Sequence, residues 1–466
     1  MYRFLGLCAL GLAVGLAAAS PASAQGFGVY EQGACMMGRS GAGVADPCQD
    51  GSGVFFNPAS LSFGSTTVTI GGALIHPYGH FTDTSGGAAN GLVSTLNSKY
   101  YPVPNLYASM PFMKRWAFGV GVFAPYGLET DWPATSEGRF LGYKSTVQGV
   151  YIQPTVAYKV NDNVSVGAGI DLTYLNVELR QHVDLSVQPF TILPNGTVLT
   201  FAQLNLVCPA AVCGTVPAGT DFADVHLAGH AWHAGFHLGV QAKVNDKVSV
   251  GARFLSEQTV DVTNGAITTT QISVPGVQVP NVLSPGTFIP VDTALAPQFG
   301  SGGKLSNQSA STSIPLPAQF VAGVAVQALP AVKVFMDYQF THWSAFGVLP
   351  INGQYLVESV TESYNNTNGV RIGTEISLTK EAVVRGGINL HGAAAPDQTV
   401  TPNLPEGSRR EFSVGVGYKL TDRVRFDAAY MYLYQPDRAG RTNPTTNNGV
   451  YSFRAHLLSA SATILF

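Results

Sequence analysis

Four cysteines carry the most readily predicted chemistry of this 466-residue chain: Cys35, Cys48, Cys208 and Cys213. An even number of cysteines in an exported chain favours disulfides, and closeness in sequence suggests pairing Cys35 with Cys48 and Cys208 with Cys213. Four cysteines allow three connectivities, so the other pairings stay open. A Cys-x4-Cys spacing without a nearby histidine is a weak zinc signature, and we expect no metal site.

Charged side chains could recognise a ligand. Alternation along the expected strands places four cations and three aspartates on the inner face, namely Arg253, Arg385, Arg425, Lys333, Asp171, Asp337 and Asp427. An arginine offers paired donors that suit a carboxylate ligand. Alternatively, these arginines pair with the aspartates and hold the structure together. The chain has no Gly-x-Ser-x-Gly elbow and no phosphate-binding glycine loop, so we expect neither an enzyme nor a cofactor.

The elements that position these residues are strands of alternating polarity. Six times, two such runs are separated by only two to four turn residues, at Met113-Lys114-Arg115, Asn161-Asp162-Asn163, Asn245-Asp246-Lys247, Leu329-Pro330-Ala331, Thr379-Lys380-Glu381 and Thr421-Asp422-Arg423. The other connections are long, and the longest cover residues 183–228 and 263–316. Short turns at one end and long loops at the other are typical of an antiparallel barrel in an outer membrane.

Composition supports a membrane location. Residues 1–24 contain Arg3, an apolar stretch and the small-residue sequence Ala22-Ser23-Ala24, which predict a cleaved signal peptide. Charged residues make up 11% of the chain, against about 25% in ordinary soluble domains. The remainder has no apolar run long enough for a spanning helix. The net charge of −3 gives no basic face for nucleic acid.

Counting the alternating runs predicts an all-β fold, a 14-stranded antiparallel transmembrane β-barrel over residues 66–466. Residues 25–65 are rich in glycine and precede the first strand, so we expect them to form a hatch of short helices and coil that plugs the lumen. The chain ends in an aromatic residue, Phe466, which resembles the signal that outer-membrane barrels present to their assembly machinery.

The sequence of the expected hatch resembles a known family. Residues 38–46 read GRSGAGVAD and residues 56–61 read FNPASL, and both resemble the hatch of the outer-membrane long-chain fatty acid transporter (FadL) family, which includes aromatic-hydrocarbon importers. The likeness continues through YGLET at 126–130, LP at 316–317, THWS at 341–344, RIG at 371–373 and the last strand. The resemblance implies a monomer in the outer membrane of a Gram-negative bacterium that takes up hydrophobic molecules.

The same resemblance implies a route for the ligand, from an apolar groove among the outer loops to a lumen pocket and out through a lateral opening in the wall. Gly121, Phe123, Pro125 and Gly127 fall where a kinked third strand would leave that opening, because proline cannot donate a ladder hydrogen bond and interior glycine weakens a strand. An ordinary proline at the outer end of the strand is the alternative.

Other residues are candidates for the hatch and the ligand site. Pro58 rigidifies the bend after Asn57, so Asn57, Pro58 and Ala59, with Phe55 and Phe56, either anchor the hatch to the wall or gate it. Candidate ligand contacts are Phe123, Tyr151 and Phe335 in the lumen, the arginines named above, and Phe201, Leu204 and Phe288 in the long loops. Alternatively, the loop residues pack on one another as a lid.

The function expected from the sequence is passive uptake of a hydrophobic small molecule. Long-chain fatty acids, alkanes and aromatic hydrocarbons all fit an apolar pocket. Outer-membrane lipid, lipopolysaccharide and the barrel-assembly machinery are the expected partners. A general diffusion porin, and an outer-membrane lipid hydrolase, are the alternative functions.

Overall fold

The computed structural model describes residues 26–29, 31–85, 90–192, 198–281, 284, 286–440 and 448–466, without the side chains of residues 190–192. The predicted signal peptide, residues 1–24, lies outside the described residues. No helix among the described residues is long and apolar enough to cross a membrane.

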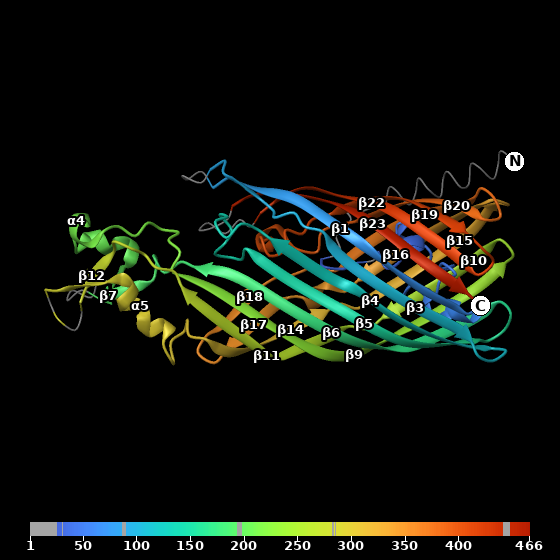
Figure 1. Ribbon diagram of the computed structural model, residues 1–466, viewed down its shortest axis with the longest axis horizontal. Coiled ribbons are helices and arrows are strands. Elements are labelled where there is room, and N and C mark those ends of the chain that lie inside the picture. Colours follow the sequence, from blue (N-terminus) through green and yellow to red (C-terminus); the bar gives the residue numbers. More distant parts are fainter. Residues whose placement is uncertain are drawn as a thin grey trace.

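The described strands form one closed antiparallel β-barrel of fourteen strands, which confirms the predicted fold (Figure 1). The wall consists of β1 (Thr67–Asp83), β3 (Tyr101–Pro111), β4 (Trp116–Asp131), β5 (Lys144–Lys159), β6 (Val164–Val183), β9 (Ala223–Asn245), β10 (Val248–Leu255) continued by β11 (Gln258–Gln271), β14 (Gln308–Leu316) continued by β15 (Gln319–Leu329), β16 (Val332–Thr341), β19 (Thr367–Ser377), β20 (Ala382–His391), β21 (Arg409–Lys419), β22 (Val424–Ala439) and β23 (Gly449–Leu465). β23 pairs with β1 and closes the barrel. Closure leaves no unpaired sheet edge for the bilayer to cover.

Two of the fourteen strands are interrupted. β11 follows β10 after two residues, and β14 meets β15 across Pro317, which has no N–H for the ladder. We expected residues 263–316 to form a loop and a strand to start near 317. The structure instead has strand at both ends of that range, because β11 pairs with β14 and also with β9. The loop itself is correspondingly shorter.

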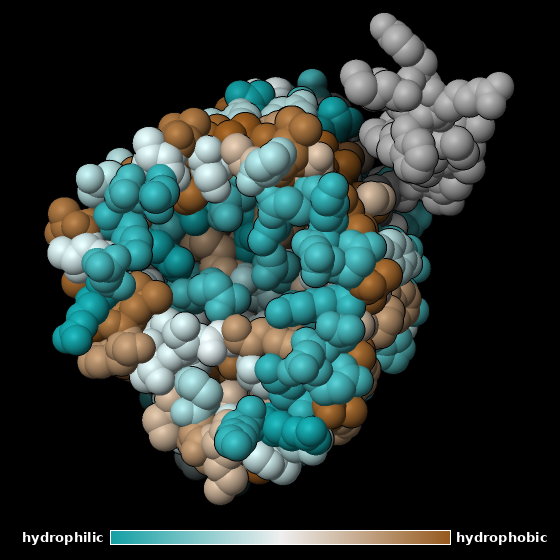
Figure 2. Space-filling model, turned by 90° about the vertical axis from the view of Figure 1, so that its right-hand side faces the viewer, coloured by the Kyte–Doolittle hydropathy of each residue, from teal (hydrophilic) through white to brown (hydrophobic). Residues whose placement is uncertain are grey.

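The outer face of the wall is apolar and the inner face is mixed, as alternation predicted. On β22, Phe426 and Tyr430 are exposed whereas Asp427 is buried. β16 repeats this pattern, with Met336 and Tyr338 exposed and Asp337 buried. Figure 2 views the barrel from the end that carries the tight turns, where hydrophilic residues gather over the face and many hydrophobic residues lie on the flanks.

The long loops at the opposite end build a small structure beyond the barrel (Figure 1, left). It contains β7 (Pro189–Ile192), β8 (Val198–Thr200), η2 (Phe201–Leu206), α4 (Ala210–Cys213), β12 (Gln278–Pro280), β13 (Phe288–Pro290) and α5 (Val291–Phe299), and we call it the loop module. Five further short elements are β2 (Val93–Thr95), η3 (Trp343–Ala345), the paired strands β17 (Val348–Gly353) and β18 (Val357–Thr361), and η4 (Asp397–Thr399).

The described part of the chain before β1, residues 26–29 and 31–64, is called the hatch segment here. It contains α2 (Ala34–Met37), α3 (Gly53–Phe56) and η1 (Pro58–Phe63), and almost all of its residues between 31 and 61 are buried. Contacts of η1 with β5, β6 and β9, and of α2 with β21 and β22, place it against opposite parts of the inner wall. The barrel lumen is therefore filled by the chain's own leading residues.

Candidate functional site: a lumen cavity beside a break in the wall

The wall loses a strand pairing halfway along β4. β3 and β4 pair from Pro111 with Ala117 up to Leu106 with Val122, and no further pairs join them. Beyond this point β4 continues along β5 with a bulge between Phe123 and Tyr126. Pro125 lies inside that bulge and cannot donate a ladder hydrogen bond, which is a sufficient local reason for the irregularity.

The hatch segment bonds to part of the β4 edge that β3 leaves unpaired. Val29 N donates to Pro125 O at 2.8 Å, and Gly127 N donates to Phe27 O at 2.9 Å. Further along, the amide of Gln32 donates to Ala124 O at 2.7 Å. The irregular part of β4 is thus hydrogen-bonded to the hatch segment instead of to β3.

A cavity of about 630 Å³ lies at this break. Its lining includes lumen residues such as Tyr126, Leu433 and Leu457, and also Pro102 and Pro104, which are exposed on the outer face of β3. The full lining is Gly28, Val29, Glu31, Ile75, Pro77, Tyr101, Pro102, Val103, Pro104, Ala124, Tyr126, Gly127, Leu128, Glu129, Thr130, Val147, Gln148, Val150, Leu404, Pro405, Glu406, Arg409, Leu433, Gln435, Phe453, Ala455 and Leu457. The cavity therefore reaches from the lumen to the outside of the wall.

A shallower groove of about 430 Å³ continues from the cavity over the outer face of β1, β3 and β23. It shares Pro102, Val103 and Pro104 with the cavity, and small residues such as Gly72 and Ala460 also line it.

Of the four residues predicted for a lateral opening, Gly127 lines the cavity. Pro125 lies in the bulge of β4, Phe123 is buried where the bulge begins, and Gly121 still pairs with Tyr107 of β3. Sequence reasoning missed Pro102 and Pro104 on β3, although two prolines in one strand were a readable signal of an unpaired edge.

The predicted aromatic ligand contacts pack mostly against the hatch. Phe123 lies between Phe55, at a ring-centroid distance of 5.0 Å, and Tyr151, at 6.3 Å. Phe335 lies in a different part of the lumen, where the guanidinium of Arg39 stacks over its ring at 4.1 Å. None of these three rings belongs to the lining of the cavity described above.

Asn57 and Pro58 fit a socket of glycines on the inner wall. The Asn57 amide donates to Val44 O at 2.7 Å and to Val240 O at 3.0 Å, and Asn57 Oδ1 accepts from Ala59 N at 3.1 Å. The socket consists of Gly167 on β6, Gly239 on β9 and Gly251 on β10, where an added Cβ would come within 2.5 Å or less of the hatch. The bend is buried, and Phe56 beside it is 4% exposed.

A second glycine socket holds the other end of the hatch. Gly373, Gly387 and Gly415 lie on the neighbouring strands β19, β20 and β21 and contact residues 38–40 at distances that a Cβ would violate. Neither socket is predictable from the sequence, because an inward-facing glycine in a strand has no sequence pattern of its own.

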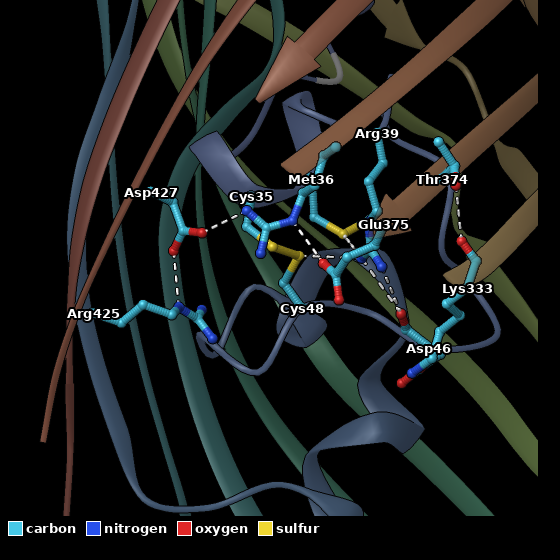
Figure 3. A network of polar contacts seen from close by, with 11 residues as sticks. Cys35, Met36, Arg39, Asp46, Cys48, Lys333, Thr374, Glu375, Arg425 and Asp427 are labelled. Atoms are coloured by element: carbon cyan, nitrogen blue, oxygen red, sulfur yellow. Dashed lines mark hydrogen bonds and ion pairs between the residues drawn. A yellow bond between two sulfur atoms is a disulfide. The ribbon is translucent and has the colours of Figure 1, made fainter. Parts of the chain in front are cut away.

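A network of charges surrounds the hatch between these sockets (Figure 3). Arg385 bonds Glu375 and Asp427, both at 2.7 Å, and Arg425 bonds the other oxygen of Asp427 at 2.9 Å. Lys333 bonds Asp46 of the hatch at 2.6 Å. Of these pairs, Lys333–Asp46 joins the wall to the hatch, whereas the other three join residues of the wall to one another.

The remaining predicted arginine, Arg253, is also bonded to protein groups. Arg253 donates to Phe55 O at 3.3 Å and to the side chain of Gln319 at 2.9 Å. Neither Arg253, Arg385 nor Arg425 lines the cavity.

Arg39 lies at the centre of the network. One of its terminal nitrogens lies 3.1 Å from Cys48 Sγ and 2.7 Å from Met36 Sδ, and burial lowers the pKa of its guanidinium. Cys35 and Cys48 form a disulfide next to it, as predicted, and so do Cys208 and Cys213 in the loop module. Asp50 is near the first disulfide, but both sulfurs there are already bonded to each other and do not offer free thiolate ligands.

The loop module has its own apolar core. Phe201 and Leu204 are buried in it together with the Cys208–Cys213 disulfide and with Val277, Val279 and Val291 from the second long loop. Phe288, the third predicted loop contact, is 41% exposed. The two loops therefore pack on each other, and Phe201 and Leu204 face that core instead of the surface.

A closed barrel with an apolar exterior, a filled lumen and a side cavity defines a transport protein of the outer membrane. The chain belongs to the family described as "Outer membrane protein transport protein (OMPP1/FadL/TodX)", which it matches over residues 15–466. It resides in the outer membrane of a Gram-negative bacterium. The resemblance found in the sequence is thereby confirmed.

Named relatives and solved structures agree with this membership. The chain is 23% identical over 437 residues to outer membrane protein P1 of Haemophilus influenzae, with 90% of this chain and 88% of the relative covered. It is 22% identical over 437 residues to the long-chain fatty acid transport protein of Escherichia coli, with 91% of this chain and 90% of that relative covered. A FadL homologue of Pseudomonas aeruginosa has a similar structure, with a TM-score of 0.76 and 20% identity, covering 95% of this chain and 100% of that one. The structure of the Pseudomonas putida toluene transporter TodX is also similar, with a TM-score of 0.66 and 17% identity. The match covers 95% of this chain and 99% of that one.

Proposed function

We propose that this protein takes up hydrophobic molecules by passive diffusion through a lateral route. The ligand first contacts the loop module, enters the lumen cavity beside β4, and leaves through the break between β3 and β4 into the membrane. The family membership supports transport of hydrophobic compounds, and the relatives named for fatty acid and toluene transport extend that support to apolar ligands.

The observation that carries this proposal is the two-sided lining of the cavity. A pocket that only stored a ligand would be enclosed by lumen residues, whereas this one is bounded by Leu433 on the inside and Pro104 on the outside. Most of the lining is apolar, so an apolar ligand gains free energy on passing from water into the cavity.

The hatch explains why the route is lateral. Residues 31–61 are buried in the lumen and are tied to the wall by the sockets and by the Lys333–Asp46 ion pair. An axial path would require these contacts to break. We propose residues 1–24 as the signal peptide, 25–65 as the hatch and 66–466 as the barrel. In this proposal Asn57, Pro58 and Ala59 anchor the hatch to the barrel wall.

A blocked opening tests the proposal. An added Cβ at Gly127 meets nothing closer than Val29 Cγ2 at 3.4 Å, so Gly127→Phe would place a ring in the cavity without a backbone clash. Uptake of a labelled apolar compound by cells that depend on this protein should fall at least about fivefold. The matched control is Gly386→Phe on β20, where the nearest atom lies at 3.7 Å. Unchanged uptake by Gly127→Phe would exclude the lateral route.

The two alternative functions have direct tests. A general diffusion porin would swell proteoliposomes in sugar solutions, and a lipid hydrolase would release fatty acid from phospholipid. Under our proposal neither activity appears. We also propose that the protein is a monomer, contacts lipid and lipopolysaccharide, and presents Phe466, which is 73% exposed at the end of β23, to the assembly machinery.

A further inference from the structure

The outward-facing residues of β22 become aromatic towards the end of the barrel that carries the loop module. Tyr430, Tyr432 and Tyr434 follow one another on that face, and Phe426 lies on it nearer the tight turns. The hydroxyl of Tyr430 lies 2.7 Å from His456 Nδ1 on β23. Girdles of aromatic side chains mark the level where lipid tails end and head groups begin. This part of the wall therefore crosses the head-group layer.

Two arginines lie on the outer face of the wall on either side of Tyr434. Arg410 on β21 is in register with Tyr434, and Tyr434 is in register with Arg454 on β23. Both arginines are exposed, and the guanidinium of Arg454 lies 5.6 Å from the centroid of the Tyr434 ring. Because neighbouring strands are about 4.8 Å apart, the two arginines leave the wall roughly 10 Å from each other.

The depth of Arg454 follows from its place on β23, which ends among the tight turns at the opposite end of the barrel from the loop module (Figure 1). Leu458 and Ile464 are exposed on the same face. Residues 454 to 464 span roughly 25 Å along the barrel axis at about 3.4 Å per residue and a tilt of about 40°, which is the usual height of the apolar band. On β21 the exposed Phe412 is followed outward by Arg410. Both arginines therefore lie at the upper boundary of the apolar band.

Within the described part of the chain, neither arginine forms an ion pair with a carboxylate. By contrast, Arg180 on β6 is bonded to Glu178 at 2.9 Å. Asp437 is exposed beyond the bulge that follows Gln435, and no described ion pair joins it to Arg410 or Arg454. An unpaired guanidinium beside lipid tails is unfavourable, whereas phosphate oxygens accept its paired N–H donors.

An apolar groove of about 480 Å³ lies on the same strands, nearer the tight turns. Val416 of β21, Phe426 and Ala428 of β22, and Ala460 and Ala462 of β23 line it. The small alanine side chains leave room between larger neighbours for a hydrocarbon chain. The outer wall thus combines cations at the head-group level with a groove at the level of the acyl chains.

We propose that Arg410 and Arg454 bind the phosphate groups of one lipid A molecule, whose acyl chain occupies this groove. The arginines lie at the end with the long loops, which faces outward in such barrels, and lipopolysaccharide is abundant in the outer leaflet there. Lipid A carries two phosphates separated by a disaccharide, so two separated guanidinium groups suit it better than a phospholipid with one phosphate. The inference rests on the lipopolysaccharide contact proposed above and not on the lateral route.

The test measures binding of labelled lipid A to the full-length protein in detergent. The variant is Arg410→Gln/Arg454→Gln, and the matched control is Arg115→Gln/Arg423→Gln, which removes the same charge from exposed arginines at the tight turns. We expect the variant to bind lipid A at least about tenfold more weakly, because it loses the charge-assisted hydrogen bonds, and the control to stay within about twofold of wild type. Wild type should prefer lipid A to dephosphorylated lipid A and to phosphatidylglycerol.

Each result either supports the inference or overturns it. Equal lipid A affinity of wild type and Arg410→Gln/Arg454→Gln overturns it, and so does an equal loss in the control. Equal binding of dephosphorylated lipid A shows that phosphate is not recognised. Equal binding of phosphatidylglycerol, or displacement of lipid A by an equal concentration of inorganic phosphate, overturns the assignment to lipid A.

Uptake of a labelled apolar compound distinguishes this inference from the transport proposal. Both arginines point away from the lumen, so Arg410→Gln/Arg454→Gln should take up the compound as wild type does while it loses lipid A binding. That result supports the inference. Failure of the lateral route in the Gly127→Phe experiment would leave lipid A binding unchanged.

Discussion

Gly239 on β9 lies so close to Asn57 of the hatch that a Cβ at Gly239 would come within 2.3 Å of Asn57 Oδ1. The same oxygen accepts a hydrogen bond from Ala59 N, which caps η1. One wall glycine thus makes room for the residue that organises the hatch bend. Because Gly167 and Gly251 press on the same bend from both neighbouring strands, the hatch is fixed here by shape as well as by hydrogen bonds.

Replacing this glycine should loosen the hatch. In Gly239→Ala, the new methyl group also meets Pro58 Cδ at 2.6 Å, so the bend must shift, at a cost of about 1–3 kcal/mol. We expect a lower thermal unfolding midpoint and increased sugar permeability in proteoliposomes. Gly386→Ala is the control, because its nearest neighbour lies at ordinary contact distance. Equal behaviour of the two variants would contradict the socket.

Arg385→Met removes the cation that joins Glu375 to Asp427. Asp427 would keep Arg425, but Glu375 would lose its hydrogen-bonded partner in a lumen site where Arg385 itself is 3% exposed. Breaking a buried ion pair from one side costs about 3–5 kcal/mol, so the denaturant concentration at the unfolding midpoint should fall markedly. Lys419→Met, at an exposed turn where Lys419 pairs with Asp422, should change little. A small effect of Arg385→Met would show that the network contributes little to stability.

Leu204 and Leu206 provide a matched pair in the loop module. Leu204 is 1% exposed in its core whereas Leu206 is 73% exposed, so Leu204→Ala should destabilise the module by about 2–5 kcal/mol and Leu206→Ala should not. Limited proteolysis between residues 198 and 222 reports this directly. Equal cleavage of the two variants would contradict the packed core.

The loop module also tests the first step of the proposed route. Deleting either long loop should weaken hydrophobic-ligand binding if the module forms the entry groove. Unchanged affinity would remove the groove from the mechanism and leave the module as a lid.

Glu406 should make the stability of the barrel mouth depend on pH. Burial raises the pKa of its carboxyl group, although hydrogen bonds from the backbone of Ala395, Ala394 and Gly26 oppose the shift. A carboxyl group with a raised folded-state pKa stabilises the fold below its unfolded pKa, and this contribution is lost as pH rises through the folded value. As the pH is raised from acid to neutral, the thermal unfolding midpoint should therefore fall less steeply in Glu406→Gln than in the wild-type protein. Identical slopes would contradict the assignment.

Much of the fold followed from local rules that the sequence displays. Alternation along β16 and β22, and tight turns such as that at Thr421, specify two-faced strands, and an apolar outer face is stable only in lipid. The disulfides were also predictable, because neighbouring cysteines face little competition for partners.

The site depended on contacts between residues far apart in the chain. Gly239 and Asn57 are brought together only when the barrel closes around the hatch, and the break above Val122 appears only when β3 and β4 diverge. The alternation of side chains along β20 correctly placed Arg385 in the lumen. Its partners, however, depend on how neighbouring strands pack in the closed barrel. The sequence by itself therefore determined a lipid-facing barrel, since side-chain period and turn length are local. The tertiary structure decided where the wall opens and which residues line the cavity, because these depend on distances across the lumen.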